Sequence, residues 1–327
     1  MILIISHPND LTTDRVIKWL KFYDYTDIIR LNTLDRFKIV KLQLKPNGLV
    51  DVLLMVNGRI FSLDEVSFLW YRNNPLIFDS SKINIVNSAF IDKSLKEFYN
   101  QEWSRCRNFI LHELQKKPSL GNFFHNSTNK LINLAIAAKV GFSIPVTFIS
   151  EYGDELLPFV KNNKAITKPI SELMSIKYHN HFVDMHTVEV SDAGISSNHL
   201  DAPALLQEKI EKWIEIRAFV LYEKIYSMAI FSQNDSQTSV DFRDYNEEKG
   251  NRMVPFNLPE EIKSKILLFM KEGNYDTGSI DLIVSKDRKW YFLEINPTGV
   301  IEMLDCCNFD IEKDIALEIL TRINHET

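Results

Sequence analysis

Three side chains that carry oxygen ligands stand close together near the end of the chain. Asp281 opens a run rich in Ile, Leu and Val, and Glu294 and Asn296 lie near the end of a second such run. The two runs, 280–285 and 290–295, are predicted to be strands joined by a polar turn. Glu294 and Asn296 are two residues apart, so both can point to the same face of their strand. Carboxylate and amide oxygens are hard ligands that suit Mg²⁺ bridging nucleotide phosphates. The pattern therefore predicts a magnesium and phosphate site, with a merely amphipathic hairpin as the alternative.

Composition and charge narrow the class of protein. The chain has 327 residues, which exceeds the usual size of one hydrophobic core, so two or three subdomains around one site are expected. The formal net charge is -6 and no long basic stripe occurs, which argues against nucleic acid as a partner. No stretch reaches the roughly 20 apolar residues of a membrane helix, and the N-terminus lacks the basic start of a signal peptide. Three cysteines without CxxC spacing suit a reducing compartment, so we expect a cytoplasmic protein that contacts no membrane.

The elements that would position these residues divide the chain into three consecutive parts, 1–125, 126–202 and 203–327. The first part opens with a buried strand at 2–6, a helix and a second strand, and a hairpin follows around Asn57–Gly58. A further strand ends at Arg72, and the apolar spacing over 86–116 predicts a long helix. The first part is therefore expected to be an α/β domain.

The other two parts contain the remaining polar residues of interest. The second part begins with a helix at 128–139, and Lys168 stands at the end of a short strand. A stretch over 171–200, rich in Ser, His and Asn, comes next; it is expected to be a loop, and its histidines lack a metal-ligand framework. The third part is predicted to contain two strands at 215–222 and 225–231 and a helix at 259–272. The carboxylate hairpin over 280–295 and a last helix at 310–323 follow.

Short motifs occur along these parts in a fixed order. Lys130 opens a helix that ends in GFSIP, and Lys168 ends a strand in ITKP. The motifs QEKI, EIR and DFR follow at 207–210, 215–217 and 241–243. Together with Asp281 and the Glu-Ile-Asn motif that ends at Asn296, this ordered set resembles the ATP-grasp superfamily from residue 126 to about residue 304. The EIR and DFR motifs look most like those of the glutamate ligases that modify ribosomal protein S6.

The first 125 residues show which group within the ATP-grasp superfamily the chain resembles most. The opening strand and helix, the strand FLWYRN and the terminal NPTG resemble ATP-grasp ligases of ribosomal peptide maturation, namely the microviridin-type cyclases and the grasp-with-spasm peptide maturases. Asn73 follows Arg72 where the family has a doubled arginine, so no role of the second arginine is carried over. The resemblance implies an α/β (α+β) protein with the ATP-grasp fold. An N-terminal α/β domain would precede a nucleotide held between the central and C-terminal subdomains.

The resemblance also implies the residues that would hold ATP. Lys130 and Lys168 would contact the phosphates as mobile point charges, with solvated surface lysines as the alternative. The backbone at Glu208, Lys209 and Ile210 would meet the adenine edge. Glu215 would take the ribose hydroxyls, with an ordinary water-facing strand residue as its alternative. The stretch over 171–200 occupies the place of the loop over the triphosphate, and whether its serines or a disordered lid provide the cover stays open.

Three arginines complete the predicted site. Arg217 lies in an apolar strand, where a guanidinium is unfavourable without an anion, and Arg243 belongs to the DFR motif. A guanidinium keeps its charge and its planar fork suits phosphate oxygens, so both would contact phosphate or an acylphosphate. Arg72 would recognise the acceptor carboxylate, since the N-terminal part closes one side of the cleft in relatives. Magnesium held by Asp281, Glu294 and Asn296 would complete the set.

The resulting hypothesis is an ATP- and Mg²⁺-dependent ligase that activates Asp or Glu side chains of a ribosomally made precursor peptide. It would join them to Ser, Thr or Lys as esters or amides. Expected partners are the leader and core of that precursor, a SPASM-domain protein and a second copy of this chain. Two alternatives stay open: a ligase that adds free amino acids to a protein or peptide, and an ATP-binding regulatory protein without turnover.

Overall fold

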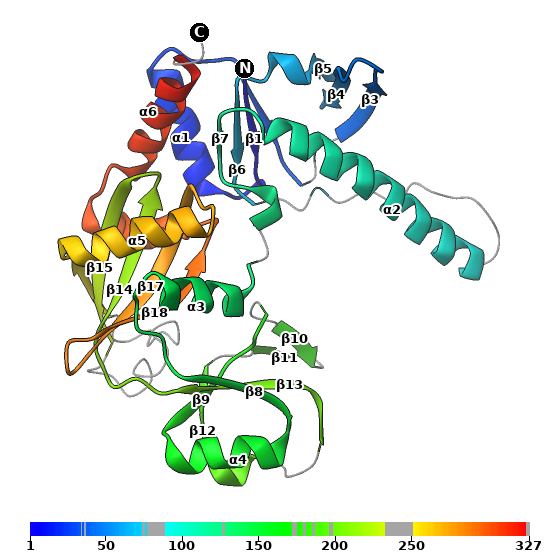
Figure 1. Cartoon of the computed structure of the whole chain (residues 1–327). Coiled ribbons are helices and arrows are strands. Elements are labelled where there is room, and N and C mark those ends of the chain that lie inside the picture. Colours follow the sequence, from blue (N-terminus) through cyan, green and yellow to red (C-terminus); the bar gives the residue numbers. More distant parts are fainter. Residues whose placement is uncertain are drawn as a thin grey trace. The chain divides into compact units, whose positions relative to one another are not determined.

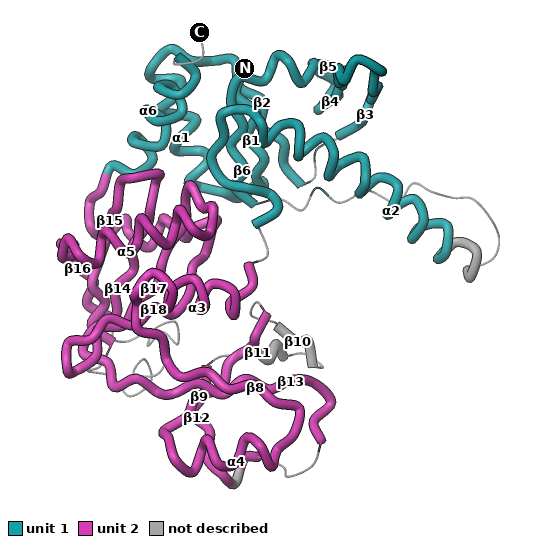
Figure 2. Tube along the Cα trace, in the orientation of Figure 1, with its two compact units in different colours: residues 1–126, 310–327 teal, residues 127–309 magenta. Residues whose placement is uncertain are grey.

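The computed structural model describes the chain in a series of segments, which are residues 1–33, 35, 37–73, 76, 89–125, 128–171, 175–178, 181–184, 187–195, 199–232 and 251–324. Contacts divide the chain into two compact units (Figure 2). Unit 1 comprises residues 1–126 and 310–327, and unit 2 comprises residues 127–309. Among the described residues, no helix is long and apolar enough to cross a membrane.

Unit 1 is built on a small parallel sheet. Its strands are, in spatial order, β2 (Ile28–Leu31), β1 (Ile2–Ile5), β6 (Phe68–Tyr71) and β7 (Ser119–Leu120). Strands β1 and β6 are buried at every position, as continuous apolar runs in parallel sheets are. Helix α1 (Leu11–Phe22) begins after β1, where the side chain of Asp10 accepts a hydrogen bond from the amide of Thr13 and so caps the helix.

The last helix of the chain also belongs to unit 1. Helix α6 (Ile311–Asn324) packs against α1, and Arg15 forms an ion pair with the buried Glu312 at 3.0 Å. Figure 1 shows the two helices side by side. The division at 1–125, 126–202 and 203–327 stays a prediction, but by contacts the C-terminal helix joins the N-terminal segment. The reason is that the apolar face of α6 is buried against unit 1, which sequence order does not reveal.

A second sheet and a long helix complete unit 1. The sheet is antiparallel and consists of β3 (Phe37–Leu44), β4 (Val50–Val56) and β5 (Arg59–Ser62), followed by a 3₁₀ turn (Leu63–Glu65). Asn57 and Gly58 both have positive φ, at +51° and +91°, as a two-residue hairpin turn requires, so the predicted hairpin is confirmed. Helix α2 (Ala89–Leu114) confirms the long helix, and a 3₁₀ turn (Phe123–His125) follows it.

Unit 2 begins with helix α3 (Lys130–Lys139) and a four-stranded antiparallel sheet. The sheet has the order β12 (Val188–Val190), β9 (Ala165–Thr167), β13 (His199–Glu208) and β8 (Thr147–Tyr152). Helix α4 (Gly153–Asn162) packs on β8, where the rings of Phe148 and Phe159 stack. We call this layer the central sheet.

Part of the stretch over 171–200, expected to be a loop, is strand. The short strands β10 (Ser175–Tyr178) and β11 (His181–Asp184) form an antiparallel pair, and a 3₁₀ turn (Asp192–Gly194) follows β12. Sequences such as SIKY and HFVD alternate polar and apolar residues, which is the period of a strand. The abundance of Ser, His and Asn obscured that period.

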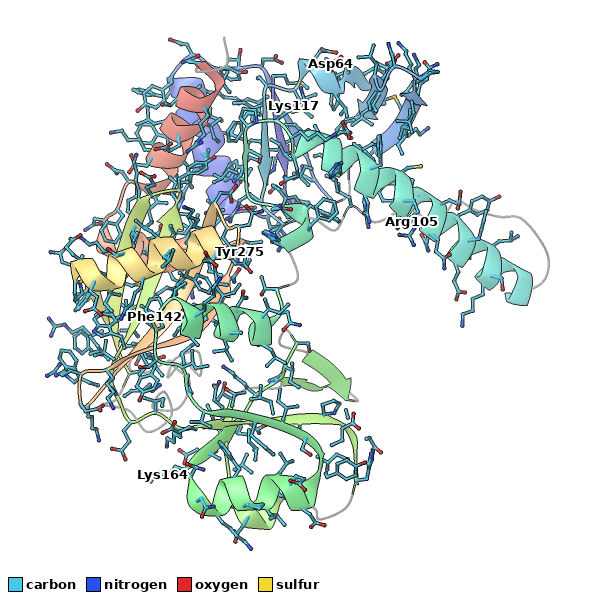
Figure 3. All side chains as sticks on the ribbon, in the orientation of Figure 1. Asp64, Arg105, Lys117, Phe142, Lys164 and Tyr275 are labelled. Atoms are coloured by element: carbon cyan, nitrogen blue, oxygen red, sulfur yellow. The ribbon has the colours of Figure 1, made fainter. Side chains whose placement is uncertain are left out.

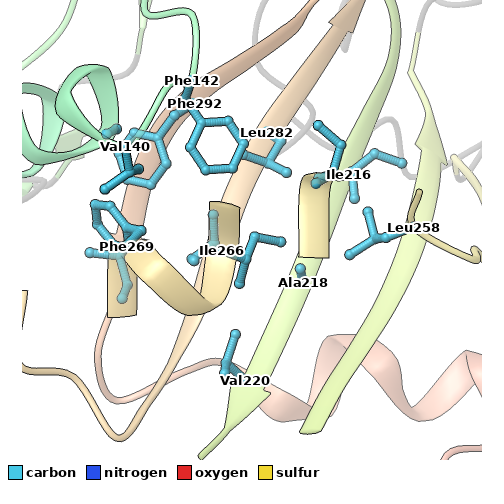
Figure 4. Close-up of a cluster of buried hydrophobic side chains, with 14 of the residues drawn as sticks. Val140, Phe142, Ile216, Ala218, Val220, Leu258, Ile266, Phe269, Leu282 and Phe292 are labelled. Atoms are coloured by element: carbon cyan, nitrogen blue, oxygen red, sulfur yellow. The ribbon is translucent and has the colours of Figure 1, made fainter. Parts of the chain in front are cut away.

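The largest sheet of unit 2, which we call the large sheet, is antiparallel throughout. Its order is β16 (Arg252–Pro255), β15 (Lys224–Phe231), β14 (Lys212–Leu221), β17 (Thr277–Ser285) and β18 (Trp290–Asn296). Helices α3 and α5 (Glu260–Glu272) cover one face, and a 3₁₀ helix (Ile301–Cys307) follows β18. Figure 4 shows the apolar residues of this face, among them Ile216, Ala218, Leu282 and Phe292, packed around α5.

The strand that carries Asp281 begins earlier than predicted. Asp281 does not open its strand: β17 starts at Thr277, so the carboxylate lies in the middle of a nine-residue strand. The glycine and serine before Ile280 concealed the true start. Both Gly278 and Ser279 are buried in the sheet, because neighbouring strands pair with them on each side.

Candidate active site

The polar residues of the large sheet gather on the face that α3 and α5 leave uncovered. In β14, Ile214, Ile216 and Ala218 belong to the core, so the alternate residues, Glu215 and Arg217, point to the opposite face. Arg217 stands directly opposite Asp281 of β17, and Asp281 stands directly opposite Glu294 of β18. One arginine and two carboxylates therefore form a row across three adjacent strands.

Arg217 and Asp281 form the centre of this row. The Nη1 atom of Arg217 donates to both carboxylate oxygens of Asp281, at 2.8 and 3.1 Å. The Arg217 side chain is only 5% exposed, and its Nε atom is buried without a partner among the described residues. The prediction that Arg217 needs an anionic partner in its apolar strand is confirmed. The partner is the carboxylate of Asp281, which is also a predicted metal ligand. Binding of phosphate or an acylphosphate by Arg217 stays a prediction, which depends on the guanidinium nitrogens that Asp281 does not take.

Asn296 ends the same strand pair and is held by the NPTG turn. Asn296 pairs with Ser279 of β17. Its Oδ1 atom accepts hydrogen bonds from the amide and the hydroxyl of Thr298, at 3.2 and 2.9 Å. The turn closes through the amide of Gly299, which donates to the Asn296 carbonyl. Gly299 has φ +56°, and a Cβ there would lie 3.1 Å from the Phe219 ring, so a larger residue would be strained at this position. Thr298 is a positioning residue that sequence reasoning did not single out.

Lys130 connects the row to the central sheet. Its Nζ atom donates to the carbonyl oxygens of Pro169 and Ser171, at 3.2 and 2.9 Å, and lies 3.8 Å from the Glu294 carboxylate. Lys168 follows the end of β9 directly and is partly buried, so it stands one residue before this contact. Lys130 therefore contacts both a predicted metal ligand and the segment that directly follows Lys168.

Glu215 lies two residues before Arg217 and is held by a buried network. Its Oε1 atom accepts from Nζ of Lys212 at 2.9 Å and from the hydroxyl of Ser232 at 2.7 Å. All three residues are nearly inaccessible to solvent. Sequence reasoning missed Lys212 and Ser232, although a lysine three residues before Glu215 in an apolar strand was the available signal. The assignment of Glu215 to the ribose hydroxyls stays a prediction.

The segment between the two sheets of unit 2 is tied down through its backbone. The amides of Glu208 and Lys209 donate to the carbonyls of Val146 and Lys164, at 2.9 and 2.8 Å, and the ammonium of Lys209 pairs with a glutamate of β12. The amide of Ile210 forms no backbone hydrogen bond with another described residue. A fixed backbone with an available N–H is what recognition of an adenine edge requires, so these residues stay candidates for it.

The remaining two arginines of the prediction are placed differently. Arg243 lies outside the described residues. Arg72 belongs to unit 1, where it directly follows β6 and is 9% exposed. Its Nε and Nη2 atoms donate to the carboxylate of Asp10, at 3.1 and 3.4 Å. Recognition of an acceptor carboxylate by Arg72 stays a prediction, and the structure gives the residue an internal carboxylate partner that the sequence did not reveal.

The Arg72–Asp10 pair leads to a prediction about stability. Burial alone would raise the pKa of Asp10, but the charge of Arg72 and several hydrogen bonds lower it below its ordinary value. A carboxyl whose pKa is lower in the folded state contributes stability above its unfolded pKa and loses it as the pH falls through the folded value. We expect Asp10→Asn, which keeps the helix cap, to lower the free energy of unfolding at neutral pH by about 3 kcal/mol.

Urea unfolding at a series of pH values measures this effect. The difference between the wild type and Asp10→Asn should be largest near pH 7 and should shrink on acidification, as the wild-type carboxyl takes up its proton. A difference that is independent of pH would contradict the assignment, because it would then come from packing rather than from the charge of Asp10.

The oxygen ligands of the predicted metal site can be compared with those that Mg²⁺ prefers in proteins. Among the described residues, no three His, Cys, Asp or Glu side chains gather as metal ligands. The predicted set consists of two carboxylates and one amide, Asp281, Glu294 and Asn296, on one face of two paired strands. Oxygen ligands of this kind fit Mg²⁺, which keeps several waters and takes only one or two carboxylates from the protein. The ligation itself stays a prediction.

Comparison with known proteins adds to this geometry. No family model matches the chain, and no curated protein matches it. Among solved structures, it is similar to a RiPP-associated ATP-grasp ligase of Chryseobacterium gregarium in complex with ADP and a leader and core peptide (RiPP, ribosomally made and modified peptide). The two are 26% identical, with a TM-score of 0.81, over 98% of this chain and 96% of that chain. The likeness therefore extends over nearly the whole chain. The chain is thus similar, over nearly its whole length, to ATP-grasp ligases of ribosomal peptide maturation.

Two further solved structures are similar to this chain along nearly its whole length. The macrocyclase MdnC of Microcystis aeruginosa, bound with the precursor peptide MdnA, is 25% identical, with a TM-score of 0.74, over 98% of this chain and 99% of that chain. The ATP-grasp ligase PsnB, complexed with minimal precursor, Mg and ADP, is 14% identical, with a TM-score of 0.70, over 98% and 97%. The second likeness supports the fold alone. The predicted ATP-grasp fold, and an enzyme rather than a silent binding protein, are thereby confirmed.

Proposed function

We propose that this ligase activates side-chain carboxylates of a ribosomally made precursor peptide with ATP and closes them into ester or amide cross-links. The observation that carries the proposal is the row Arg217–Asp281–Glu294 with Lys130 beside it, which gathers cations and carboxylates on one face of the large sheet. The relative from Chryseobacterium gregarium is in complex with ADP and with leader and core peptides, and MdnC is bound with its precursor. Their similarity along nearly the whole chain supports the same class of substrate.

The proposed reaction has two steps, activation of the carboxylate and formation of the cross-link. A carboxylate oxygen of the peptide attacks the γ-phosphorus of ATP, the bond to the β-phosphate oxygen breaks, and ADP leaves an acylphosphate behind. A hydroxyl or amine of the same peptide then attacks the acyl carbon and loses a proton, and inorganic phosphate leaves. The peptide loses one water for each bond formed.

The residues of the large sheet would stabilise charge in both steps. Phosphoryl transfer depends mainly on positioning and on neutralising the equatorial oxygens. Lys130 and Lys168 would bind phosphate oxygens, and the unused side of the Arg217 fork would bind the acylphosphate. Magnesium held by Asp281, Glu294 and Asn296 would neutralise the β- and γ-phosphates. The Arg217–Asp281 ion pair would fix the arginine beside that site.

The partners and the location are proposed on the same basis. The relatives bind leader and core peptides, which supports a precursor with both segments as the substrate. A SPASM-domain partner protein and a homodimer are proposed from the family resemblance. A cytoplasmic location is proposed from the cysteine pattern and from the need for ATP.

The proposed function can be tested by mass. The ligase is mixed with ATP, Mg²⁺ and a small precursor peptide, whose gene is expected beside that of the ligase, with and without the leader segment. Loss of one water per cross-link, strongly dependent on the leader, is expected, because a docked leader raises the effective concentration of the core at the site. A gain of mass from added free amino acids, without dehydration of the precursor, would instead establish the amino-acid-adding alternative.

A further inference from the structure

Two adjacent cysteines, Cys306 and Cys307, take no part in the proposed mechanism. They end the 3₁₀ helix (Ile301–Cys307) that follows β18, and their Sγ atoms lie 3.9 Å apart. Their surroundings differ, because Cys306 is exposed to solvent and Cys307 is buried. An accessible thiol beside a second thiol that can resolve its oxidation is the arrangement of a redox-sensing pair.

The short helix that ends with these cysteines is connected to the candidate active site at its other end. Gly299 closes the NPTG turn on Asn296, and the helix starts two residues after that glycine. Ile301 and Leu304 are each 1% exposed, and the helix packs against β15 and β16 of the large sheet. A change of the backbone at the cysteine pair would therefore disturb a firmly packed segment that begins beside a predicted metal ligand.

A disulfide between adjacent residues requires such a change of the backbone. The Cα atoms of neighbouring residues lie about 3.8 Å apart, whereas disulfides normally join Cα atoms about 4.4–6.8 Å apart. The amide of Asn308 donates to the carbonyl of Asp305 at 3.2 Å, so a hydrogen bond spans the pair and would be disturbed on closure. A bond formed under these constraints is strained and readily reduced. It therefore suits a reversible switch better than a permanent cross-link.

From these contacts we propose that Cys306 and Cys307 form a reversible disulfide when the ligase meets a peroxide, and that this disulfide switches off the candidate active site. The second part of the proposal rests on the proposed function, and the first part does not. The Cys306 thiolate attacks one oxygen of hydrogen peroxide, the O–O bond breaks, and hydroxide leaves a sulfenic acid on Cys306. The Cys307 sulfur then attacks the Cys306 sulfur, the S–S bond forms, and the S–O bond breaks. The departing oxygen takes up the Cys307 proton and leaves as water, so the peroxide is reduced to two waters while the thiols are oxidised.

The different burial of the two thiols sets the order of these steps. Burial raises the pKa of the Cys307 thiol to about 12, and the neighbouring Cys306 thiolate adds to this rise. Cys307 therefore stays protonated, and the exposed Cys306 meets the peroxide first. Conversion of Cys306 to a neutral sulfenic acid removes the second cause of the rise. The Cys307 proton is then lost more easily, which favours the second step.

Mass and thiol counts test the first part without an assay of the ligase reaction. The reduced chain is treated with hydrogen peroxide, and we expect it to lose two hydrogen atoms and two of its three free thiols, which dithiothreitol restores. Cys307→Ala removes the resolving thiol, so peroxide should add oxygen at Cys306 instead. Cys106→Ser is the matched control and should behave as the wild type. It lies on the exposed surface of α2, next to Arg105, which Figure 3 labels.

The rate of precursor dehydration tests the second part. Peroxide should lower the rate of the wild type at least about tenfold, because a small displacement of a metal ligand is costly, and dithiothreitol should restore the rate. Cys306→Ser changes one exposed thiol to a hydroxyl. Its untreated rate should stay within about twofold of the wild type, and peroxide should no longer lower that rate. Binding of a fluorescent ATP analogue in the presence of Mg²⁺ should follow the same pattern.

The outcomes separate this inference from the function on which its second part rests. Retention of both thiols by the wild type in peroxide would overturn the inference while dehydration of the precursor continues. Formation of the disulfide with an unchanged rate and unchanged nucleotide binding would overturn the switch. The mass and the thiol count need no turnover, so failure of the proposed function would leave the disulfide decided by its own measurement.

Discussion

Glu294→Gln is expected to remove ATP-dependent product formation, by about a thousandfold or more, while the ligase stays folded. The substitution keeps the size of the side chain and removes the charge that would hold a cation against the phosphates. Lewis-acid stabilisation by a metal is worth several kcal/mol in the transition state, which corresponds to a loss of this size. Glu294 is partly exposed, at 21% for its side chain, and the ammonium of Lys130 lies 3.8 Å from its carboxylate. Its neutralisation should therefore change the free energy of unfolding by no more than about 1 kcal/mol.

The measurement is the rate of precursor dehydration at saturating ATP over a range of Mg²⁺ concentrations, with thermal unfolding as the check on the fold. Glu261→Gln, on the exposed surface of α5, is a matched control in the same unit and should behave as the wild type. Asp281→Asn should also lose activity, but it should unfold more easily, because it leaves the buried Arg217 without its carboxylate. Near wild-type turnover by Glu294→Gln at saturating Mg²⁺ would show that the metal assignment is wrong.

Much of the fold could be predicted because local chemistry agrees with the final structure. The hairpin at Asn57–Gly58 followed from two residues that tolerate positive φ, and helices α2 and α5 followed from their apolar spacing. The parts that could not be predicted depend on contacts distant in sequence. Helix α6 looks like the end of unit 2 in sequence order but packs on α1, and nothing in its own residues indicates that partner.

The site shows the same limit at the level of side chains. The sequence supplied Arg217, Asp281 and Glu294 as separate candidates, and their row across β14, β17 and β18 depends on the strand register. A shift of register by one residue would put one member of each pair on the opposite face. The contacts of Lys130 with two backbone carbonyls could not be found from sequence either, because backbone atoms carry no residue-specific signal.

The pairing of the strands also explains why the sequence alone could not separate a functional from a structural role of Arg217. Arg217 needed an anion in any interpretation of its strand, and both a phosphate and an aspartate satisfied that need. The structure shows that Asp281 takes one nitrogen of the guanidinium and leaves Nε buried without a partner in the described part of the chain. An arginine that served only to neutralise Asp281 would be expected to use both sides of its fork. The structural role of Arg217 is shown, and its role in binding phosphate stays a prediction.

The second large effect is expected at Lys130, at the start of α3. Lys130→Met keeps the length of the side chain but removes the ammonium that lies between Glu294 and the carbonyls of Pro169 and Ser171. Two consequences follow. The phosphates lose a neutralising cation, and the segment after Lys168 loses its connection to the large sheet. Loss of one preorganised donor to transition-state charge typically costs about a hundredfold to a thousandfold in rate, so kcat/KM for ATP should fall by at least that much.

The same helix offers a matched control for this variant. Lys139, in the last turn of α3, is 70% exposed and pairs with Glu272, so Lys139→Met should leave the rate unchanged within about twofold. Lys168→Ala should reproduce the loss seen with Lys130→Met, and so should Arg243→Ala. Because Lys130 is partly buried and donates two hydrogen bonds, Lys130→Met should also lower the free energy of unfolding by about 1–2 kcal/mol. That change leaves the protein folded at assay temperature, so lost activity reports the missing charge. Normal specific activity combined with a large loss of stability would show instead that Lys130 acts only as a structural link between the two sheets of unit 2.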